Sequence, residues 1–170
     1  MDSKFNSSEI LLILGANIQK SRKMRGYTIS DLATSIKYDR SCLSGLEYGE
    51  QNIKYMTALN LACKLDVPFP ALFSRNYPNN LSNNKIDSFC NFTKDDYLLV
   101  FIENLRKIMK SKQIKQIDIY GATDIQTATI SRIINRKSRN PTIKTLYAMA
   151  YTTETSMYDL FLRTAIKEDI

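Results

Sequence analysis

The 170-residue sequence contains no histidine and no tryptophan, and it has only 3 cysteines, 4 prolines and 5 glycines. The lack of histidine removes the commonest general base and the commonest zinc ligand. Cys42, Cys63 and Cys90 are odd in number and lack CxxC spacing, so they support neither a disulfide framework nor a zinc ribbon. We expect Cys63 to be a small core residue. With no glycine-rich phosphate loop and no paired catalytic motif either, the sequence predicts a protein that is not an enzyme and binds no metal or cofactor.

Long apolar runs are also absent. The run near the start, residues 10–14, has five residues, whereas a membrane span needs about 18. It also lacks the basic flank and small-residue cleavage site of a signal peptide. We therefore expect no contact with a membrane and a cytoplasmic location.

A surplus of basic residues is present, with a formal net charge of +7. Residues 1–74 hold 9 Lys and Arg against 7 Asp and Glu, whereas residues 96–170 hold 12 against 8. A basic surplus favours an acidic partner, and nucleic acid is the first candidate. The second half of the chain is the more basic one.

Residues 126–135 have two different helical faces. Ile130, Ile133 and Ile134 recur at helical spacing and predict one apolar stripe. The polar residues away from the stripe can bond to base edges in a DNA major groove, and they are Gln126, Thr127, Thr129 and Arg132. Upstream, residues 114–120 predict another short helix and residues 121–124 a tight turn containing glycine. Helix, turn and helix in this order form the DNA-binding helix-turn-helix unit.

The same rhythm occurs twice. Residues 8–25 predict a first helix, Thr28 with Asp31 a capped second one, and Asp39 the cap of a third. A fourth helix over residues 54–65 and a short one ending at residue 73 follow. Residues 75–94 are rich in asparagine and predict a linker. The pattern then returns with a shift of 87 residues, which becomes 88 before the fourth helix. There Asn140 is expected to cap that helix, with Pro141 as its first residue, and a fifth helix is expected over residues 156–167.

The residues that carry a family resemblance recur in both halves. In the first they are Leu14, Gly15, Ile18, Arg22, Gly26, Leu32, Ala33, Leu43, Ser44, Glu47, Gly49, Leu61, Ala62, Leu65 and Val67. In the second they are Leu105, Arg106, Gln116, Ile119, Ile125, Ile130, Ser131, Arg132, Asn140, Pro141, Thr142, Thr145, Leu146 and Ala150. Each half resembles the Cro/C1-type helix-turn-helix domain of the XRE family.

The resemblance implies an all-α protein with two small five-helix domains of the lambda-repressor-like type. The expected domains are residues 8–74 and residues 95–168, joined by the asparagine-rich linker over residues 75–94. The sequence departs from the family in the turn, where Lys37 and Asp124 replace the usual glycine, and at Ile134, which stands where the first half has Glu47.

By resemblance, the third helix of each half enters the major groove and the start of the second helix contacts phosphate. In the second half the implied contacts are Gln116, Gln126, Thr127, Thr129 and Arg132, with Arg136, Lys137 and Arg139 on the flanking backbone. In the first half they are Arg40, Ser41, Ser44 and Tyr48. The first set is poorer, because Asp39 and Glu47 put negative charge near phosphates. Alternatively, Asp39 is only the helix cap and Glu47 a surface partner of a nearby lysine.

The leading hypothesis is a sequence-specific, DNA-binding transcriptional regulator that acts as a repressor on double-stranded DNA. Two copies could straddle half-sites about 34 Å apart, because the linker reaches up to about 66 Å. Alternatively, the chain forms a homodimer and uses one copy on DNA. A second hypothesis is that one domain binds DNA while the first domain binds and inhibits a protein partner, as in antitoxins or inhibitors from mobile elements. Tyr38, Tyr48 and Tyr55, expected to be exposed, would suit such an interface.

Overall fold

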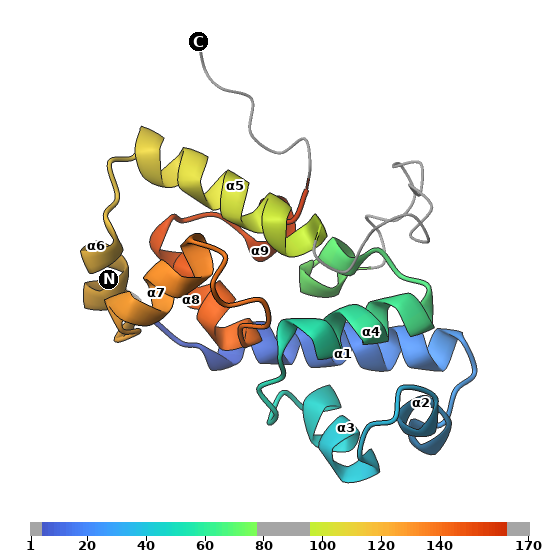
Figure 1. The fold of residues 1–170 in the computed structure, drawn as a ribbon. Coiled ribbons are helices and arrows are strands. Elements are labelled where there is room, and N and C mark those ends of the chain that lie inside the picture. Colours follow the sequence, from blue (N-terminus) through green and yellow to red (C-terminus); the bar gives the residue numbers. More distant parts are fainter. Residues whose placement is uncertain (1–4, 78–95, 163–170) are drawn as a thin grey trace.

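The computed structural model describes residues 5–77 and 96–162, which form helices joined by short loops (Figure 1). Most of the predicted linker lies outside these ranges. Its first residues, 75–77, lie along the first helix, where the Tyr77 hydroxyl is 2.7 Å from Ser21 Oγ. None of the described helices combines the length and the apolar character that crossing a membrane requires.

The first half contains α1 (Ser8–Met24), α2 (Ile29–Ser35), α3 (Arg40–Glu47), α4 (Tyr55–Leu65) and η1, a 3-10 helix (Phe69–Phe73). Its helices start where their caps predict. Thr28 Oγ1 accepts a hydrogen bond from the amide of Asp31, whose carboxylate accepts one from the amide of Thr28. The carboxylate of Asp39 accepts a bond of 2.9 Å from the amide of Cys42 at the start of α3.

The second half contains α5 (Asp96–Ser111), α6 (Gln116–Thr123), α7 (Thr127–Ile134), α8 (Ile143–Thr152) and α9 (Met157–Leu160). The predicted turn over residues 121–124 was placed too early, since α6 continues through Gly121 to Thr123 and has Asp124 as its C-cap. A single glycine costs a helix only about 1 kcal/mol and does not end it by itself. The predicted fifth helix is observed only over α9, and residues from 163 onward lie outside the described ranges.

The backbone confirms the predicted repeat. Left-handed conformations, with positive φ, occur at equivalent places in the two halves: Gly26 and Gln113, Lys37 and Asp124, Gly49 and Arg136, Asp66 and Glu154. The separation is 87 residues for the first three pairs and 88 for the last, which agrees with one inserted residue before the fourth helix. Lys37 and Asp124 occupy the turns between the second and third helices, where glycine would adopt this conformation without steric cost.

A buried asparagine ties the first helix of each half to the last one. Asn17 Nδ2 on α1 donates a hydrogen bond of 3.0 Å to the carbonyl of Leu72 in η1. Its equivalent, Asn104 Nδ2 on α5, donates a bond of 3.0 Å to the carbonyl of Leu160 in α9. Carbonyls at a helix end have no intrahelical partner, so these amides satisfy groups that would otherwise be buried alone.

The halves differ in how closely the first and third helices approach. A Cβ atom added to Gly15 on α1 would lie 2.3 Å from the carbonyl oxygen of Leu46 on α3, a distance that requires glycine there. The equivalent residue of the second half is Ile102, which is buried. An isoleucine side chain at this place requires α5 and α7 to be further apart than α1 and α3.

The two halves join through the segments that lead into α4 and α8. The junction, residues 52–56 and 140–144, contains an antiparallel β-bridge between Lys54 and Thr142. Its hydrogen bonds run from Tyr55 N to Pro141 O (2.9 Å), Ile143 N to Ile53 O (2.9 Å), Met56 N to Asn140 Oδ1 (3.0 Å) and Lys144 N to Asn52 Oδ1 (3.2 Å). Each bond therefore has a counterpart in which the two halves exchange roles.

Two sequence predictions are corrected at the junction. Asn140 does not cap the fourth helix, because α8 begins at Ile143 and its cap is Thr142, whose side chain accepts a hydrogen bond from Thr145 N. Asn140 bonds the other half instead. Tyr55 is not an exposed tyrosine but is fully buried.

Cys63 is also misplaced by the sequence prediction. It is exposed rather than part of the core, since the core face of α4 holds Leu61, Ala62 and Leu65. One residue of helix turns the side chain by about 100°, which carries Cys63 off that face.

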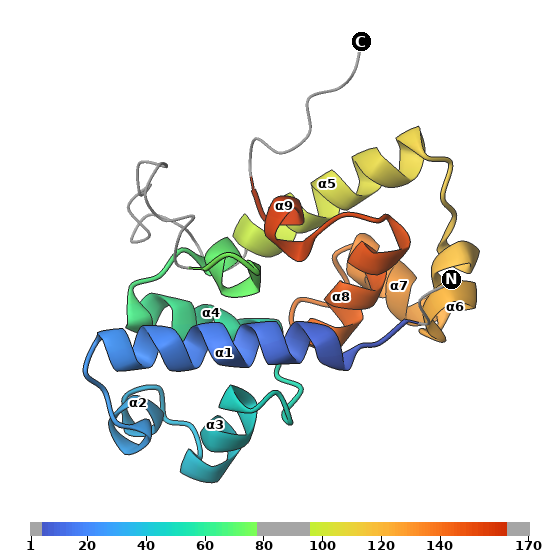
Figure 2. The same ribbon diagram turned by 180° about the vertical axis from the view of Figure 1, so that it is seen from behind.

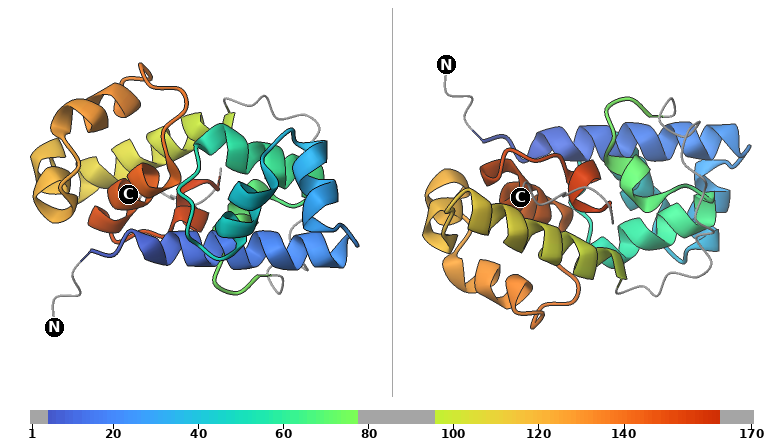
Figure 3. Two further views of the ribbon diagram at one scale, coloured as in Figure 1. Left: turned by 90° about the horizontal axis from the view of Figure 1, so that it is seen from below. Right: turned by 90° about the horizontal axis from the view of Figure 1, so that it is seen from above.

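Aromatic rings fill the space behind the junction. Phe69 and Phe73 of η1 contact Phe161 with ring-centroid distances of 4.9 and 5.3 Å, and Phe69 also contacts Tyr97 of α5 at 5.1 Å. Figures 1 and 2 show α1 running alongside both α4 and α8. In Figure 3, the α2–α3 pair and the α6–α7 pair lie at opposite ends of the molecule, with the junction between them.

Candidate nucleic-acid interface

The third helix of the second half, α7, buries one face and exposes the other. Ile130, Ile133 and Ile134 are between 0 and 7% exposed and pack into the core, as the sequence predicts. The left-handed residue Asp124 ends α6 and lets the chain turn into α7. Burial of the isoleucine stripe determines which side chains of α7 point to solvent.

The solvent face of α7 carries the predicted base-contacting residues. Gln126, Thr127, Thr129 and Arg132 are all exposed. In the described part of the chain, no hydrogen bond or ion pair engages the guanidinium of Arg132. A guanidinium can donate two bonds to the acceptors of guanine, and a glutamine amide matches the edge of adenine. This face therefore offers unsatisfied donors and acceptors of the kind that base edges match.

The flanking cations follow α7 directly. Arg136, Lys137 and Arg139 are exposed on the loop between α7 and α8. Arg136 is 3.4 Å from a carboxylate oxygen of Glu103, and both side chains are 54% exposed, so the pair is worth little in water. Gln116, the predicted phosphate contact, is the first residue of α6 and is half-buried. The amide groups at this helix end have no intrahelical partner, a location that suits an anionic ligand.

The equivalent face of the first half is more neutral. Arg40 and Tyr48 are exposed, and Tyr48 has 65% of its surface accessible. Ser41 is exposed but donates a hydrogen bond of 2.6 Å to the carboxylate of Asp39, and Ser44 is half-buried. The bonds from Ser41 and from the amide of Cys42 hold the pKa of Asp39 below its usual value. Asp39 is therefore both the predicted cap and a persistent negative charge at the start of α3.

Glu47 does not contribute a negative charge to this face. It is 6% exposed, and its carboxylate receives Arg22 Nε at 2.5 Å and Nη2 at 2.9 Å. The sequence prediction of an exposed glutamate near phosphate is wrong, and its lysine-partner alternative is wrong too, because α1 brings Arg22 against the end of α3. In the second half the equivalent positions hold Met109 and Ile134, both buried.

The third helices therefore differ in charge. Residues 37–54 contain three cations and three anions, one of them the buried Glu47, whereas residues 124–142 contain four cations and one anion. The four cations of the second face are Arg132, Arg136, Lys137 and Arg139. Any electrostatic attraction to phosphate is concentrated on α7 and the loop after it.

The sequence prediction missed the role of Asn52 and misassigned that of Asn140. Both amides hold the two halves together, as the junction bonds show. They are separated by 88 residues, so each stands at the same place in the repeat. An asparagine recurring three residues before the start of each fourth helix was the available signal.

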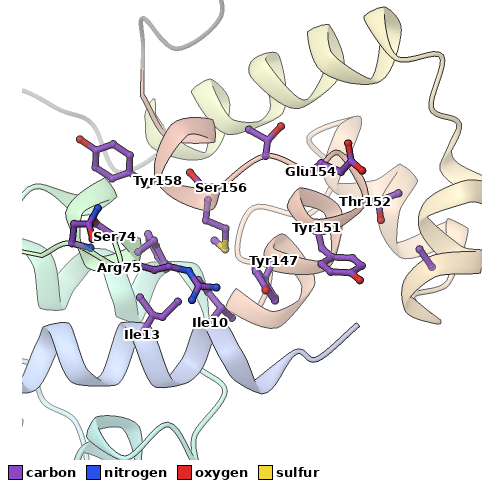
Figure 4. Close-up of a pocket in the computed structure, with 15 residues that line it drawn as sticks. Ile10, Ile13, Ser74, Arg75, Tyr147, Tyr151, Thr152, Glu154, Ser156 and Tyr158 are labelled. Atoms are coloured by element: carbon purple, nitrogen blue, oxygen red, sulfur yellow. The ribbon is translucent and has the colours of Figure 1, made fainter. Parts of the chain in front are cut away.

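A cleft of about 730 Å³ lies between the halves, and no residue of α3 or α7 lines it (Figure 4). Its walls come from α1, η1, α6, α8 and α9 and from the loops after η1 and α8, and Arg75 points into it beside Tyr147. Glu9 pairs with Arg75 and accepts a bond of 2.6 Å from the Tyr147 hydroxyl. This bond, followed by the contact with Arg75, lowers the pKa of Glu9. None of the predicted DNA-contacting residues lines the cleft.

Comparison with known protein families matches each half of the chain to a helix-turn-helix family model. Residues 18–72 match the family model described as helix-turn-helix, and residues 104–165 match the model of the Cro/C1-type HTH DNA-binding domain. No curated protein and no solved structure is significantly similar to the chain. The matched ranges contain α2–α3 and α6–α7, the helix pairs that carry the residues described above. The chain thus consists of two tandem Cro/C1-type helix-turn-helix domains, the kind found in DNA-binding regulators.

Proposed function

We propose that the protein is a sequence-specific transcriptional regulator that acts as a repressor and reads operator DNA through α7, with α3 as the second reader. The observation that carries the proposal is the exposed face of α7, where Gln126, Thr127, Thr129 and Arg132 lie next to three further cations. Phosphate contacts from the cations would position the helix, and base contacts from the polar face would supply specificity. A protein that occupies an operator excludes other proteins from it, which is why repression is the proposed direction.

The test is selection of binding sites from a random-sequence duplex library, performed with the wild type and with Arg132→Ala and Arg40→Ala at two salt concentrations. Loss of a base-contacting arginine should cost about 1–3 kcal/mol and relax specificity at one position. A charge-matched control is Lys110→Ala, which removes an exposed cation of α5 that is not one of the predicted DNA contacts. Enrichment of no sequence by the wild type would refute the proposal.

Lys137→Ala separates positioning from reading. It should weaken binding to all duplexes by a similar factor and should reduce the slope of log K against log salt by about 1. A change in the preferred sequence caused by Lys137→Ala would contradict its assignment to the backbone. Repression itself is tested with a reporter gene that carries the selected site between promoter and coding sequence.

A protein partner of the first domain is the second candidate function. Tyr48 and Leu12 are 65% and 58% exposed. They are close in space, because Gly49, the neighbour of Tyr48, lies against Leu12: a Cβ atom on Gly49 would be 2.8 Å from Leu12 Cδ2. Exposed tyrosine is favoured in protein interfaces. If Arg40→Ala leaves the selected site and its salt dependence unchanged while Arg132→Ala abolishes binding, the first domain is free for such a partner.

A further inference from the structure

The junction has twofold symmetry. Residues 52–56 and residues 140–144 are equivalent in the repeat, and each segment donates to the other the bonds that it receives in return. The β-bridge is antiparallel and joins Lys54 to Thr142, its own equivalent. A contact of residue i with j, accompanied by the same contact of j with i, is the signature of an isologous interface between two subunits.

The aromatic core continues the same relation. Phe73 and Phe161 are equivalent residues, 88 positions apart, and their rings stack at 5.3 Å with an interplanar angle of 26°. Two equivalent residues in contact with each other must lie on the symmetry axis. The bridge and this stacked pair therefore mark two points on one axis through the middle of the chain.

The symmetry axis of the junction determines the direction of α3 relative to α7. Tandem domains in a sequence might be expected to read direct repeats, because a linker alone allows either orientation. The axis of the junction relates α3 to α7, and two helices related in this way run in opposite directions, as in a symmetric dimer on a palindrome. The symmetry of the surrounding helices is approximate, because the packing of α1 on α8 and of α6 on α8 has no equal counterpart between α5 and α4 or between α2 and α4. Figures 1 and 3 show α3 and α7 on either side of the junction.

The two reading faces are chemically different. The second presents Gln126, Thr129 and Arg132, and the equivalent residues of the first half are Asp39, Cys42 and Gly45. The exposed side chains of the first face, which include Arg40, Ser41 and Tyr48, stand at other positions of the repeat. A homodimer must present the same side chains to both halves of its site, whereas this chain does not. We infer that a single copy of the protein is a covalent pseudo-dimer whose target is duplex DNA with two inverted but unequal half-sites. The inference rests on the proposed DNA-binding function.

The experiment uses the full chain and four duplexes built from the half-sites that the library selection identifies. One duplex holds the two different half-sites inverted, one holds them as a direct repeat, and two are perfect palindromes of either half-site. Affinity is measured by fluorescence anisotropy, and the stoichiometry of each complex by analytical ultracentrifugation.

The inverted, unequal duplex should bind at least about tenfold more tightly than each of the other three, because several base pairs are mismatched in each alternative. Its complex should contain one chain per duplex. Insertion of about five base pairs between the half-sites, half a helical turn, should remove most of this advantage, because the junction prevents one domain from following the rotation of its site.

Different failures have different meanings. The inference would be overturned if a palindrome bound two chains as tightly as the inverted, unequal duplex binds one, or more tightly. Preference for the direct repeat would overturn it too. Both outcomes would leave the proposed DNA-binding function standing. Absence of an enriched sequence in the selection would overturn both. The double variant Asn52→Ala with Asn140→Ala provides an internal check. It leaves α3 and α7 unchanged but should reduce the penalty of the inserted base pairs.

Discussion

Replacement of the buried ion pair in the first half by the residues of the second half tests how this fold is stabilised. Arg22 and Glu47 are 7% and 6% exposed and form two hydrogen bonds of 2.5 and 2.9 Å. At the equivalent positions the second half has two uncharged residues, Met109 and Ile134, and both are buried. The chain therefore supplies its own apolar alternative for this site.

The single variant Arg22→Met leaves a carboxylate buried without its partner. Breaking a buried pair in this way costs about 3–5 kcal/mol, whereas replacement of the whole pair by apolar residues is often neutral or stabilising by about 1–4 kcal/mol. Arg22 Nη1 also donates a bond of 2.7 Å to the carbonyl of Tyr27, and its loss subtracts about 1 kcal/mol. The double variant Arg22→Met with Glu47→Ile should therefore lie within about 1 kcal/mol of the wild type or above it.

The assay is urea unfolding of the full chain followed by circular dichroism, with Arg25→Met as the matched control. Arg25 bonds Asp66 at 2.8 Å, but the two side chains are 47% and 71% exposed, so its loss should cost less than about 1 kcal/mol. The reasoning is refuted if Arg22→Met is as mild as the control, or if the double variant is as unstable as Arg22→Met.

Three further substitutions address other contacts. Asn17→Ala should destabilise the protein by about 2 kcal/mol, since it removes the buried amide that donates to the carbonyl of Leu72 in η1; a loss under about 0.5 kcal/mol in urea unfolding would show that water replaces the amide. Lys37→Gly should raise stability by up to about 1 kcal/mol, because φ is 54° there; a lower unfolding midpoint would contradict the strain argument. Tyr147→Phe should weaken acid sensitivity. The hydrogen bond from Tyr147 lowers the pKa of Glu9 below 4.5, so its stabilisation is present above that pH and is lost as the pH falls further. If Tyr147→Phe and the wild type lose the same free energy of unfolding between about pH 5 and 3, this bond does not contribute to acid sensitivity.

Periodicity and caps were sufficient to predict most of the fold. The isoleucine stripe of α7, the capping box at Thr28 and the cap at Asp39 are local features, and local sequence determines them. The family resemblance places the turn residues at Lys37 and Asp124, and both have the left-handed conformation, whereas the local pattern alone starts the second turn too early, at Gly121.

Contacts between distant segments could not be read in the same way. The burial of Glu47 depends on Arg22, which is 25 residues away, and local spacing makes the glutamate look like an ordinary surface residue. Asn140 before Pro141 has the pattern of a helix cap, but its amide is used by the first half across 84 residues. In both cases a distant segment decides the outcome: Arg22 decides that Glu47 is buried rather than exposed, and the first half decides that Asn140 bonds Met56 rather than capping a helix.

Joining the two domains in one chain changes what each of them must satisfy. In a homodimer every substitution appears twice, so the interface and the reading helix must work in both half-sites. Here the junction is intramolecular, and a tether raises the effective concentration of one domain near the other to the millimolar range. The symmetric bonds need not hold two separate molecules together at low concentration, and each half is free to differ. Gly15 stands opposite Ile102, Arg22 opposite Met109, and the neutral face of α3 opposite the basic face of α7. In the proposed complex, substitution of Arg132 should therefore alter the preference for one half-site and leave the other unchanged, an outcome that no homodimer on a palindrome can give.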